Sequence, residues 1–173
     1  MIRAILFVAA LSSVPATAAE LDPCFTPGEN CTRKIVDEID SAKGSLLVQA
    51  YEFTSYPIIN AIVRANDRGV DVSIILDQDN DKAKRSGQES IAAHLIAHGL
   101  FVLIDNRHIA HNKVMVIDGK DVITGSFNFT IAAQDRNAEN VLIIHDNPVI
   151  AKAYADNFWR RADDSHPPAR TGD

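Results

Sequence analysis

The sequence predicts a single α/β domain in which a mixed β-sheet is flanked by helices on both faces. Short runs of branched apolar residues alternate along the chain with segments whose apolar residues recur three or four positions apart. The first pattern is typical of strands and the second of amphipathic helices. Between two of the apolar runs lies Asp118-Gly119-Lys120, a tight-turn sequence that predicts an antiparallel hairpin. The alternation favours helices packed on a sheet, and the hairpin makes that sheet mixed.

The strands are expected where β-branched residues cluster between polar or glycine-containing turns. The expected strands are 45–51, 70–76, 100–104, 113–117, 121–124 and 139–145. The segment 77–87 is polar and is expected to be a loop between a strand and a helix.

The helices are expected at 32–43, 57–69, 89–98 and from 147 onward. Thr32 can cap the first helix, and Pro57 suits the first turn of the second. Glycines follow the first three segments and serve as stop signals: Gly44, Gly69 and Gly99. After residue 163 the chain is polar and contains prolines, which predicts a loose tail over 164–173.

Composition agrees with an ordinary globular domain. The 173 residues are 46% hydrophobic and 23% charged, which excludes disordered, collagen-like and coiled-coil proteins. This length fits one domain with a sizeable core. The formal net charge of −6 argues against binding nucleic acid through bulk positive charge, although it leaves room for a local basic site.

The first 18 residues are expected to be a signal peptide. A short positive start at Arg3 is followed by an apolar run over 4–11 and by small residues up to a cleavage site after Ala18, with cleavage after Ala19 as an overlapping choice. A buried helix or a membrane anchor are the alternatives, but the apolar run is shorter than the ~20 residues that span a bilayer. The mature domain is then expected at 19–163, in a periplasmic or secreted protein.

Two cysteines, Cys24 and Cys31, follow this segment. An oxidising compartment would let them form a disulfide, and the Pro27-Gly28 turn between them can bring the two sulfurs together. Two free thiols or half of a metal site are the alternatives. Zinc is disfavoured because the chain has no further cysteine and no histidine nearby in sequence.

Residues suited to binding phosphate gather between residues 111 and 128. His111 and Lys113 are two positions apart, so they project to the same face of a strand. A neutral imidazole beside a cation can attack an anion that the cation holds. Gly125 permits close approach of the backbone to a ligand, and Ser126 and Asn128 supply neutral donors. Together these groups predict a phosphate site.

The same residues resemble the signature of the phospholipase D superfamily. His111-x-Lys113, Asp118 and Gly125-Ser126-x-Asn128 match the H-x-K-x4-D-x6-G-S-x-N pattern at every position. The chain resembles in particular the small bacterial endonucleases of the Nuc type, which carry this signature once. Three more segments add to the likeness: 50–54, 68–72 and 137–140. The resemblance extends from about residue 35 to 159, and related exported proteins also carry a cysteine pair near the start.

The resemblance implies a role for each matching residue. His111 would be the nucleophile that forms a phosphohistidine, and Lys113 and Asn128 would bind the phosphoryl oxygens. Ser126 would add a further donor to the phosphate. Glu139 would orient the histidine, as the third member of a catalytic triad does.

Two signature residues are expected to support the structure. Asp118 lies at the predicted hairpin turn and is not expected to touch phosphate, and Gly125 is needed for its backbone. This chemistry requires no metal and no cofactor. It does require a second histidine as general acid, which implies a homodimer because the signature occurs once per chain.

The function expected from the sequence is therefore that of an exported, metal-independent phosphodiesterase that hydrolyses nucleic acid. The sequence leaves open whether the enzyme accepts RNA as well as DNA. One alternative is a phospholipase D that acts on lipid headgroups. Another is a nucleic-acid-binding module with little activity. Lys82, Lys84 and Arg85 could form a basic patch for a phosphate backbone or could simply be a solvated loop.

Overall fold

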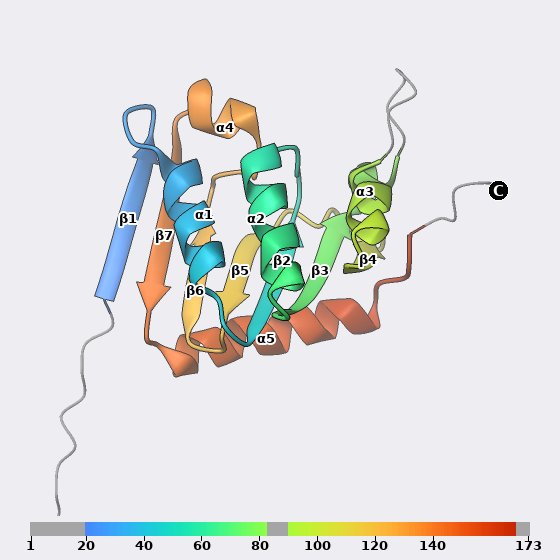
Figure 1. Ribbon diagram of the computed structural model, residues 1–173. Coiled ribbons are helices and arrows are strands. Elements are labelled where there is room, and N and C mark those ends of the chain that lie inside the picture. Colours follow the sequence, from blue (N-terminus) through green and yellow to red (C-terminus); the bar gives the residue numbers. More distant parts are fainter. Residues whose placement is uncertain (1–19, 83–89, 169–173) are drawn as a thin grey trace, which may run out of the picture.

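A computed structural model describes residues 20–82 and 90–168 of the chain, and the expected signal peptide lies outside the described residues. The described part contains one seven-stranded sheet in the order β1-β7-β6-β5-β2-β3-β4 (Figure 1). The strands are β1 Glu20–Thr26, β2 Ser45–Ala50, β3 Asp71–Asp77, β4 Phe101–Asp105, β5 Lys113–Ile117, β6 Asp121–Gly125 and β7 Glu139–His145. β2, β3 and β4 are parallel, and the other neighbouring pairs are antiparallel, which confirms the mixed sheet.

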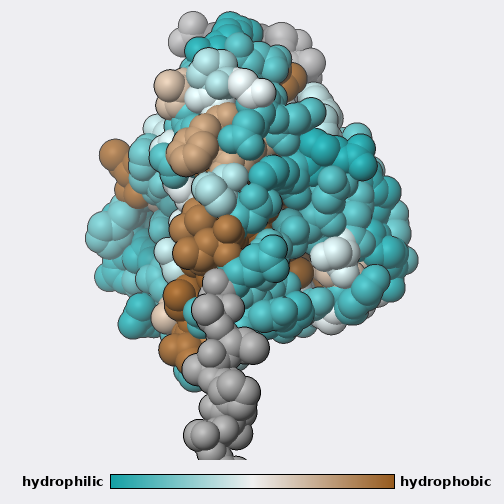
Figure 2. Space-filling view, turned by 90° about the vertical axis from the view of Figure 1, so that its left-hand side faces the viewer, coloured by the Kyte–Doolittle hydropathy of each residue, from teal (hydrophilic) through white to brown (hydrophobic). Residues whose placement is uncertain are grey.

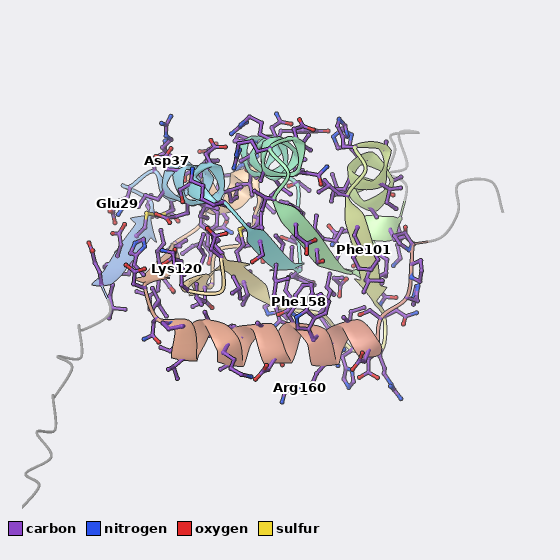
Figure 3. The ribbon with its side chains drawn as sticks, turned by 60° about the horizontal axis from the view of Figure 1, so that its bottom comes forward. Glu29, Asp37, Phe101, Lys120, Phe158 and Arg160 are labelled. Carbon is purple, nitrogen blue, oxygen red and sulfur yellow. A yellow bond between two sulfur atoms is a disulfide. The ribbon has the colours of Figure 1, made fainter. Side chains whose placement is uncertain are left out.

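Helices cover both faces of the sheet, as the sequence predicts. α1, α2 and α3 pack on one face, and the long α5 crosses the other face beneath β6, β5, β2, β3 and β4 (Figures 1 and 3). The helices are α1 Cys31–Ser41, α2 Tyr56–Asp67, α3 Ile91–Ala97, α4 Ile131–Asp135 and α5 Pro148–Asp163, with a short 3-10 helix at Gln78–Asp81. None of the helices in the described ranges is long and apolar enough to cross a membrane.

β5 shows how one strand serves two cores. All five of its residues are buried, and successive side chains point to opposite faces of the sheet. Met115 and Ile117 belong to the large core beneath α1, α2 and α3. Val114 and Val116 belong to a smaller core against α5. On α5, Phe158 is buried toward the sheet and Arg160 points away from it (Figure 3).

The sequence did not predict β1, α4 or the short 3-10 helix. β1 contains Asp22 and Pro23, which are poor strand formers, and it lies at the edge of the sheet, where proline is tolerated. The expected loose tail differs as well, because the backbones of His166 and Ile104 exchange two hydrogen bonds of 2.7 and 3.0 Å. The chain directly after α5 is therefore tied to the other edge strand, β4.

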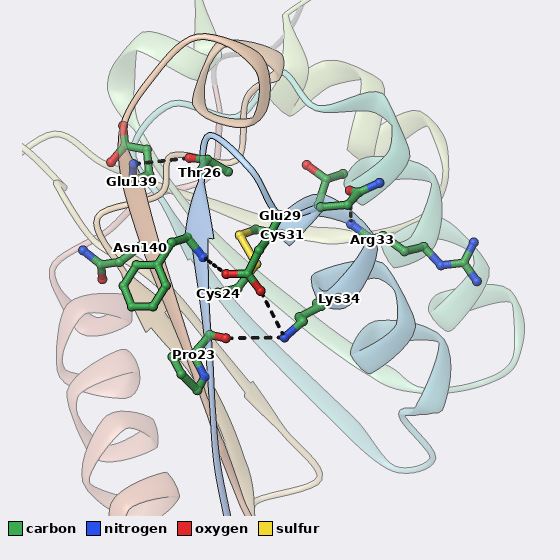
Figure 4. Close-up of a disulfide and its surroundings, with 12 residues drawn as sticks. Pro23, Cys24, Thr26, Glu29, Cys31, Arg33, Lys34, Glu139 and Asn140 are labelled. Atoms are coloured by element: carbon green, nitrogen blue, oxygen red, sulfur yellow. Dashed lines mark hydrogen bonds and ion pairs between the residues drawn. A yellow bond between two sulfur atoms is a disulfide. The ribbon is translucent and has the colours of Figure 1, made fainter.

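A disulfide joins β1 to α1. Cys24 of β1 and Cys31, the first residue of α1, are bonded through their sulfurs and are completely buried (Figure 4). In the chain-entropy picture a loop of this size contributes about 2–3 kcal/mol. The Lys34 ammonium group adds an ion pair of 2.7 Å with the Asp22 carboxylate. These links hold the edge strand against the first helix.

The outward face of β1 is apolar. Leu21 and Phe25 are 57% and 56% exposed. Figure 2 shows a band of hydrophobic surface along this side of the molecule, bordered by hydrophilic residues. α5 packs on β6, β5, β2, β3 and β4, so β1 lies outside the group of strands that this helix crosses.

Asp118 lies at the turn of the β5–β6 hairpin with a φ of 51°. Its carboxylate accepts hydrogen bonds of 2.7–3.2 Å from the backbone N–H groups of Lys43, Gly44 and Ser45. Burial alone would raise the pKa of Asp118, but these three donors, with Lys120 nearby, hold the pKa below its ordinary value. Asp118 thus connects the hairpin to the α1–β2 turn.

We expect Asp118→Asn to lower the free energy of unfolding by about 1–2 kcal/mol at pH 7, because a charged acceptor of several N–H groups is lost. A carboxylate whose pKa is depressed by folding stabilises the fold above its unfolded pKa, about 3.9, and loses this effect as the pH falls through its folded pKa. The difference between wild type and variant should therefore be full at pH 5–7 and shrink below about pH 4. Urea denaturation at pH 7, 5 and 3 measures it.

The matched control is Asp156→Asn, which removes a carboxylate from the exposed Lys152–Asp156 pair on α5. Such a surface pair is worth less than about 0.5 kcal/mol at any of these pH values. A pH-independent effect of Asp118→Asn would contradict the role assigned to its charge.

Candidate active site

The signature residues meet at one end of the sheet because of how the strands run. Lys113 begins β5, Gly125 ends β6 and Glu139 begins β7. Since these three strands are antiparallel in turn, the start of β5, the end of β6 and the start of β7 lie at the same edge. The end of β2 joins them, with Ala50 paired to Lys113. Asp118, at the far end of β5, is the one signature residue outside this group.

His111, Lys113 and Tyr51 form the centre of the site. His111 is exposed and precedes β5, and its ring centroid lies 4.5 Å from that of Tyr51. The Nζ atom of Lys113 lies 4.9 Å from the centroid of the Tyr51 ring and donates a 2.7 Å hydrogen bond to the carbonyl of His111. The imidazole and the ammonium group therefore both lie against the Tyr51 ring.

Lys113 is a largely buried cation, with only 6% of its surface exposed. Burial lowers the pKa of Lys113, and the carboxylates of Glu139 and Glu52 partly offset this. A desolvated ammonium group gains more from an anion than a hydrated one does. Lys113 is thus suited to hold a phosphate beside His111.

Gly125 allows two strands to approach closely. Its φ is +153°, and a Cβ atom there would lie 2.2 Å from the carbonyl oxygen of Asn140. That same oxygen accepts hydrogen bonds from the backbone N–H groups of Ser126 and Phe127, at 3.1 and 3.2 Å. The turn after β6 is therefore pinned to the start of β7, a contact that no side chain larger than hydrogen permits.

Ser126 and Glu139 are hydrogen-bonded to each other. The Ser126 hydroxyl donates to Oε2 of Glu139 at 2.6 Å and accepts from the backbone N–H of Asn140 at 3.0 Å. Asn137 donates to Oε1 of Glu139 at 3.0 Å. Within the described residues no hydrogen bond joins Glu139 to His111 of the same chain, and the orienting role of Glu139 stays a prediction.

The backbone of Glu139 is held by β1. Its N–H donates to the Thr26 hydroxyl at 3.2 Å, and that hydroxyl donates to the carbonyl of Ala133 at 2.9 Å (Figure 4). The unpredicted strand β1 thus supports the start of β7.

Asn128 already has a partner in the free protein. Its Nδ2 donates a 2.9 Å hydrogen bond to Oε2 of Glu52, a residue that the sequence analysis did not select. Its Oδ1 atom is buried and has no hydrogen-bond partner among the described residues. Glu52 takes one of the two N–H donors of the Asn128 amide, so a phosphate oxygen must use the other donor or displace the Glu52 carboxylate.

Two buried carboxylates that the sequence analysis also missed hold the loop before His111. Asp77, 2% exposed, accepts hydrogen bonds from the backbone N–H groups of Ala110 and Asp79, at 2.9 and 3.0 Å. Asp105 accepts from the N–H of Arg107 at 3.2 Å and pairs with Arg161 of α5. The signal in the sequence was an aspartate at the end of each of two neighbouring strands.

The proposed basic patch is only partly described. Lys82 forms an ion pair of 2.5 Å with Asp79, so its charge is neutralised locally. Lys84 and Arg85 lie outside the described residues. Among the side chains that the structure does describe, no three of His, Cys, Asp or Glu lie close enough together to hold a metal ion.

Comparison with known families places these residues in context. A family model described as "Cardiolipin synthase, PLD-like domain" matches residues 35–162. A protein named phospholipase D from Rickettsia felis is 44% identical over 143 residues, which cover 83% of this chain and 70% of that protein. The corresponding protein of Rickettsia typhi is 45% identical over 138 residues and is covered over 66% of its length, just under two thirds. A mitochondrial cardiolipin hydrolase from Xenopus tropicalis is 32% identical, with 92% of this chain and 76% of that protein covered.

Solved structures give the same fold. The phospholipase D family member Nuc from Salmonella typhimurium superposes with a TM-score of 0.78 at 34% identity, covering 86% of this chain and 97% of that chain. NucT from Helicobacter pylori superposes with a TM-score of 0.77 at 22% identity, covering 87% of this chain and 99% of that one. The second likeness concerns the fold alone.

We expect Gly125→Ala to destabilise the fold by about 3 kcal/mol or more, since it combines an unfavourable φ with a backbone clash, and to abolish activity by displacing Ser126. Gly69→Ala separates the two causes, because Gly69 has a φ of +87° but nothing within 4 Å of an added Cβ. It should cost about 1 kcal/mol and leave activity intact. Thermal unfolding and phosphodiesterase assays measure both variants, and equal costs would show that the close approach to Asn140 does not matter.

Proposed function

The chain belongs to the phospholipase D superfamily of hydrolases that act on phosphodiester bonds. We propose that it is an exported endonuclease that cleaves nucleic acid without a metal ion. The observation that carries the proposal is the placement of His111 beside the buried Lys113, with Ser126 and Asn128 at the same edge of the sheet. The match to Salmonella Nuc, at 34% identity over 97% of that chain, supports the nuclease.

The proposed reaction has two steps. A ring nitrogen of neutral His111 attacks the phosphorus while Lys113 and Asn128 bind its oxygens, and the bond from phosphorus to the leaving oxygen breaks. A protonated histidine gives its proton to that oxygen. Water then attacks the phosphohistidine and gives a proton to the second histidine, and the phosphorus–nitrogen bond breaks, so both imidazoles return to their starting states.

The second histidine is proposed to be His111 of a second copy. The chain carries the signature once, and a two-fold axis through the site would repeat every group on the other side of the phosphorus. One feature of the single chain supports this: among the described residues, Glu139 accepts hydrogen bonds from Ser126 and Asn137 and makes none with its own His111.

Export is part of the proposal. The expected signal peptide over 1–18 and the disulfide between Cys24 and Cys31 both suit a periplasmic or secreted protein. A phospholipase D acting on lipid headgroups is the second candidate, favoured by the names of the relatives from Rickettsia and Xenopus.

A substrate panel with excess EDTA tests the function directly. It contains single- and double-stranded DNA, RNA, phosphatidylcholine and cardiolipin. We expect nucleic acid to be cleaved in EDTA, because His111 supplies the nucleophile and Lys113 the positive charge. His111→Ala should lower turnover by several orders of magnitude. The matched control is His108→Ala, which removes another exposed histidine of the same loop and should retain activity. Loss of activity in EDTA with rescue by Mg²⁺ would refute the mechanism, and cleavage of lipids alone would favour the second candidate.

The shared site is tested by mixing subunits. Wild-type chains mixed with His111→Ala chains should form heterodimers that lack either the nucleophile or the acid and so cannot turn over. After subunit exchange, activity should fall roughly with the square of the wild-type fraction. Sedimentation at the assay concentration provides the control, and a fully active monomer would contradict the proposal.

A further inference from the structure

Most cations of this acidic protein are neutralised by carboxylates. Within residues 20–82 and 90–168 the paired cations are Arg33, Lys34, Arg64, Arg68, Lys82, Arg107, Lys120, Lys152 and Arg161. The described cations that form no ion pair are Lys43, Lys113, Arg136 and Arg160. In a protein of net charge −6, local unpaired cations are the groups best suited to attract a polyanion.

Arg136 lies on the wall of a cleft that adjoins the active site. The cleft has a volume of about 430 Å³, within the range of small-ligand sites. Its lining includes Tyr51, Glu52, Asp79, Ile131 and Arg136. Two of these residues also belong to the active site: Tyr51 contacts His111 and Lys113, and Glu52 is bonded to Asn128. The cleft and the candidate active site therefore share Tyr51 and Glu52.

The other charged groups of the cleft are already engaged. Asp79 is paired with Lys82, and Glu52 accepts the hydrogen bond from Asn128. Arg136 follows α4 as its C-cap, and its exposed guanidinium group has no hydrogen bond or ion pair with any described residue. Ile131, 51% exposed, and Tyr51 provide apolar surface between these polar groups.

We infer that the cleft binds the nucleotide next to the scissile bond and that Arg136 binds the phosphate of that nucleotide. A guanidinium group pairs with phosphate oxygens through two parallel hydrogen bonds, and the apolar wall suits the packing of a sugar or base. The inference rests on the proposed nuclease function and adds to it a second phosphate subsite. It explains how the site would select a chain of phosphodiesters over a lone one.

Arg136→Gln tests the subsite with two substrates. On a fluorescent oligodeoxynucleotide the variant should raise KM about tenfold with kcat little changed, as for the loss of one charge-assisted contact to bound substrate. On bis-p-nitrophenyl phosphate, which has no flanking phosphate, kcat/KM should equal that of wild type. Oligonucleotide binding, measured in a His111→Ala background, should depend on salt with a slope shallower by about 0.7 for a single strand.

Arg160→Gln is the matched control. Arg160 also lacks a carboxylate partner, but it lies on the outward side of α5, on the opposite face of the sheet from α1, α2 and α3 (Figure 3). The Arg160→Gln substitution removes the same charge at a position away from the cleft, so it should leave KM and the salt slope as in wild type. An equal change in both variants would show a general charge effect and overturn the subsite. An equal loss of kcat/KM by Arg136→Gln on both substrates would also overturn the subsite. It would mean that Arg136 acts at the reacting phosphate or is needed for folding.

The two hypotheses fail in different ways. If wild type hydrolyses bis-p-nitrophenyl phosphate but no oligonucleotide, the nuclease function is wrong and the subsite falls with it. If wild type cleaves the oligonucleotide and Arg136→Gln does so with unchanged KM and salt slope, the nuclease function stands and only the subsite is wrong.

Discussion

The backbone pairing of β5 with β2 and β6, together with that of β6 with β7, determines where the candidate catalytic groups lie. With Ala50 opposite Lys113 and Gly125 opposite Val141, the ends of four strands come to one edge of the sheet. A slip of one residue in any of these pairs would turn the side chains to the opposite face. The interior of β5, buried on both sides, makes such a slip costly. The hydrophobic packing of the strands therefore secures the geometry of the polar residues at their ends.

Gly125 and Asp118 protect this register from the two ends of the hairpin. At the active edge, Gly125 lets the turn after β6 bond to the backbone of Asn140. At the opposite edge, the Asp118 carboxylate binds the backbone of the α1–β2 turn. Both residues belong to the same signature as His111, although neither places a charge near the site. The signature therefore contains residues that stabilise the fold as well as residues suited to the chemistry.

Sequence reasoning reached most of the fold because β2 to β7 are rich in branched residues and their turns carry glycine or aspartate. It missed β1, whose proline and acidic residues form a strand only when β7, the disulfide and α1 hold them in place. It grouped the signature residues between 111 and 128 because they follow one hairpin, β5–β6. It missed Glu52, Asp77 and Arg136 because their partners, or the cleft they line, are formed by segments distant in sequence. Contacts of that kind depend on strand order, which periodicity does not reveal.

In the free chain, two carboxylates of the protein itself bind the donors of the candidate site. Glu52 occupies the amide of Asn128, and Glu139 occupies the hydroxyl of Ser126. Both carboxylates also counter the effect of burial on the pKa of Lys113. A phosphate that enters the site competes with these carboxylates for the donors of Asn128 and Ser126. A phosphodiester that is additionally anchored at a neighbouring position gains more, because the anchor adds to its affinity without changing the reacting groups. The proposed subsite would let an acidic protein act on a polyanion through a few unpaired cations while the rest of its surface stays negative.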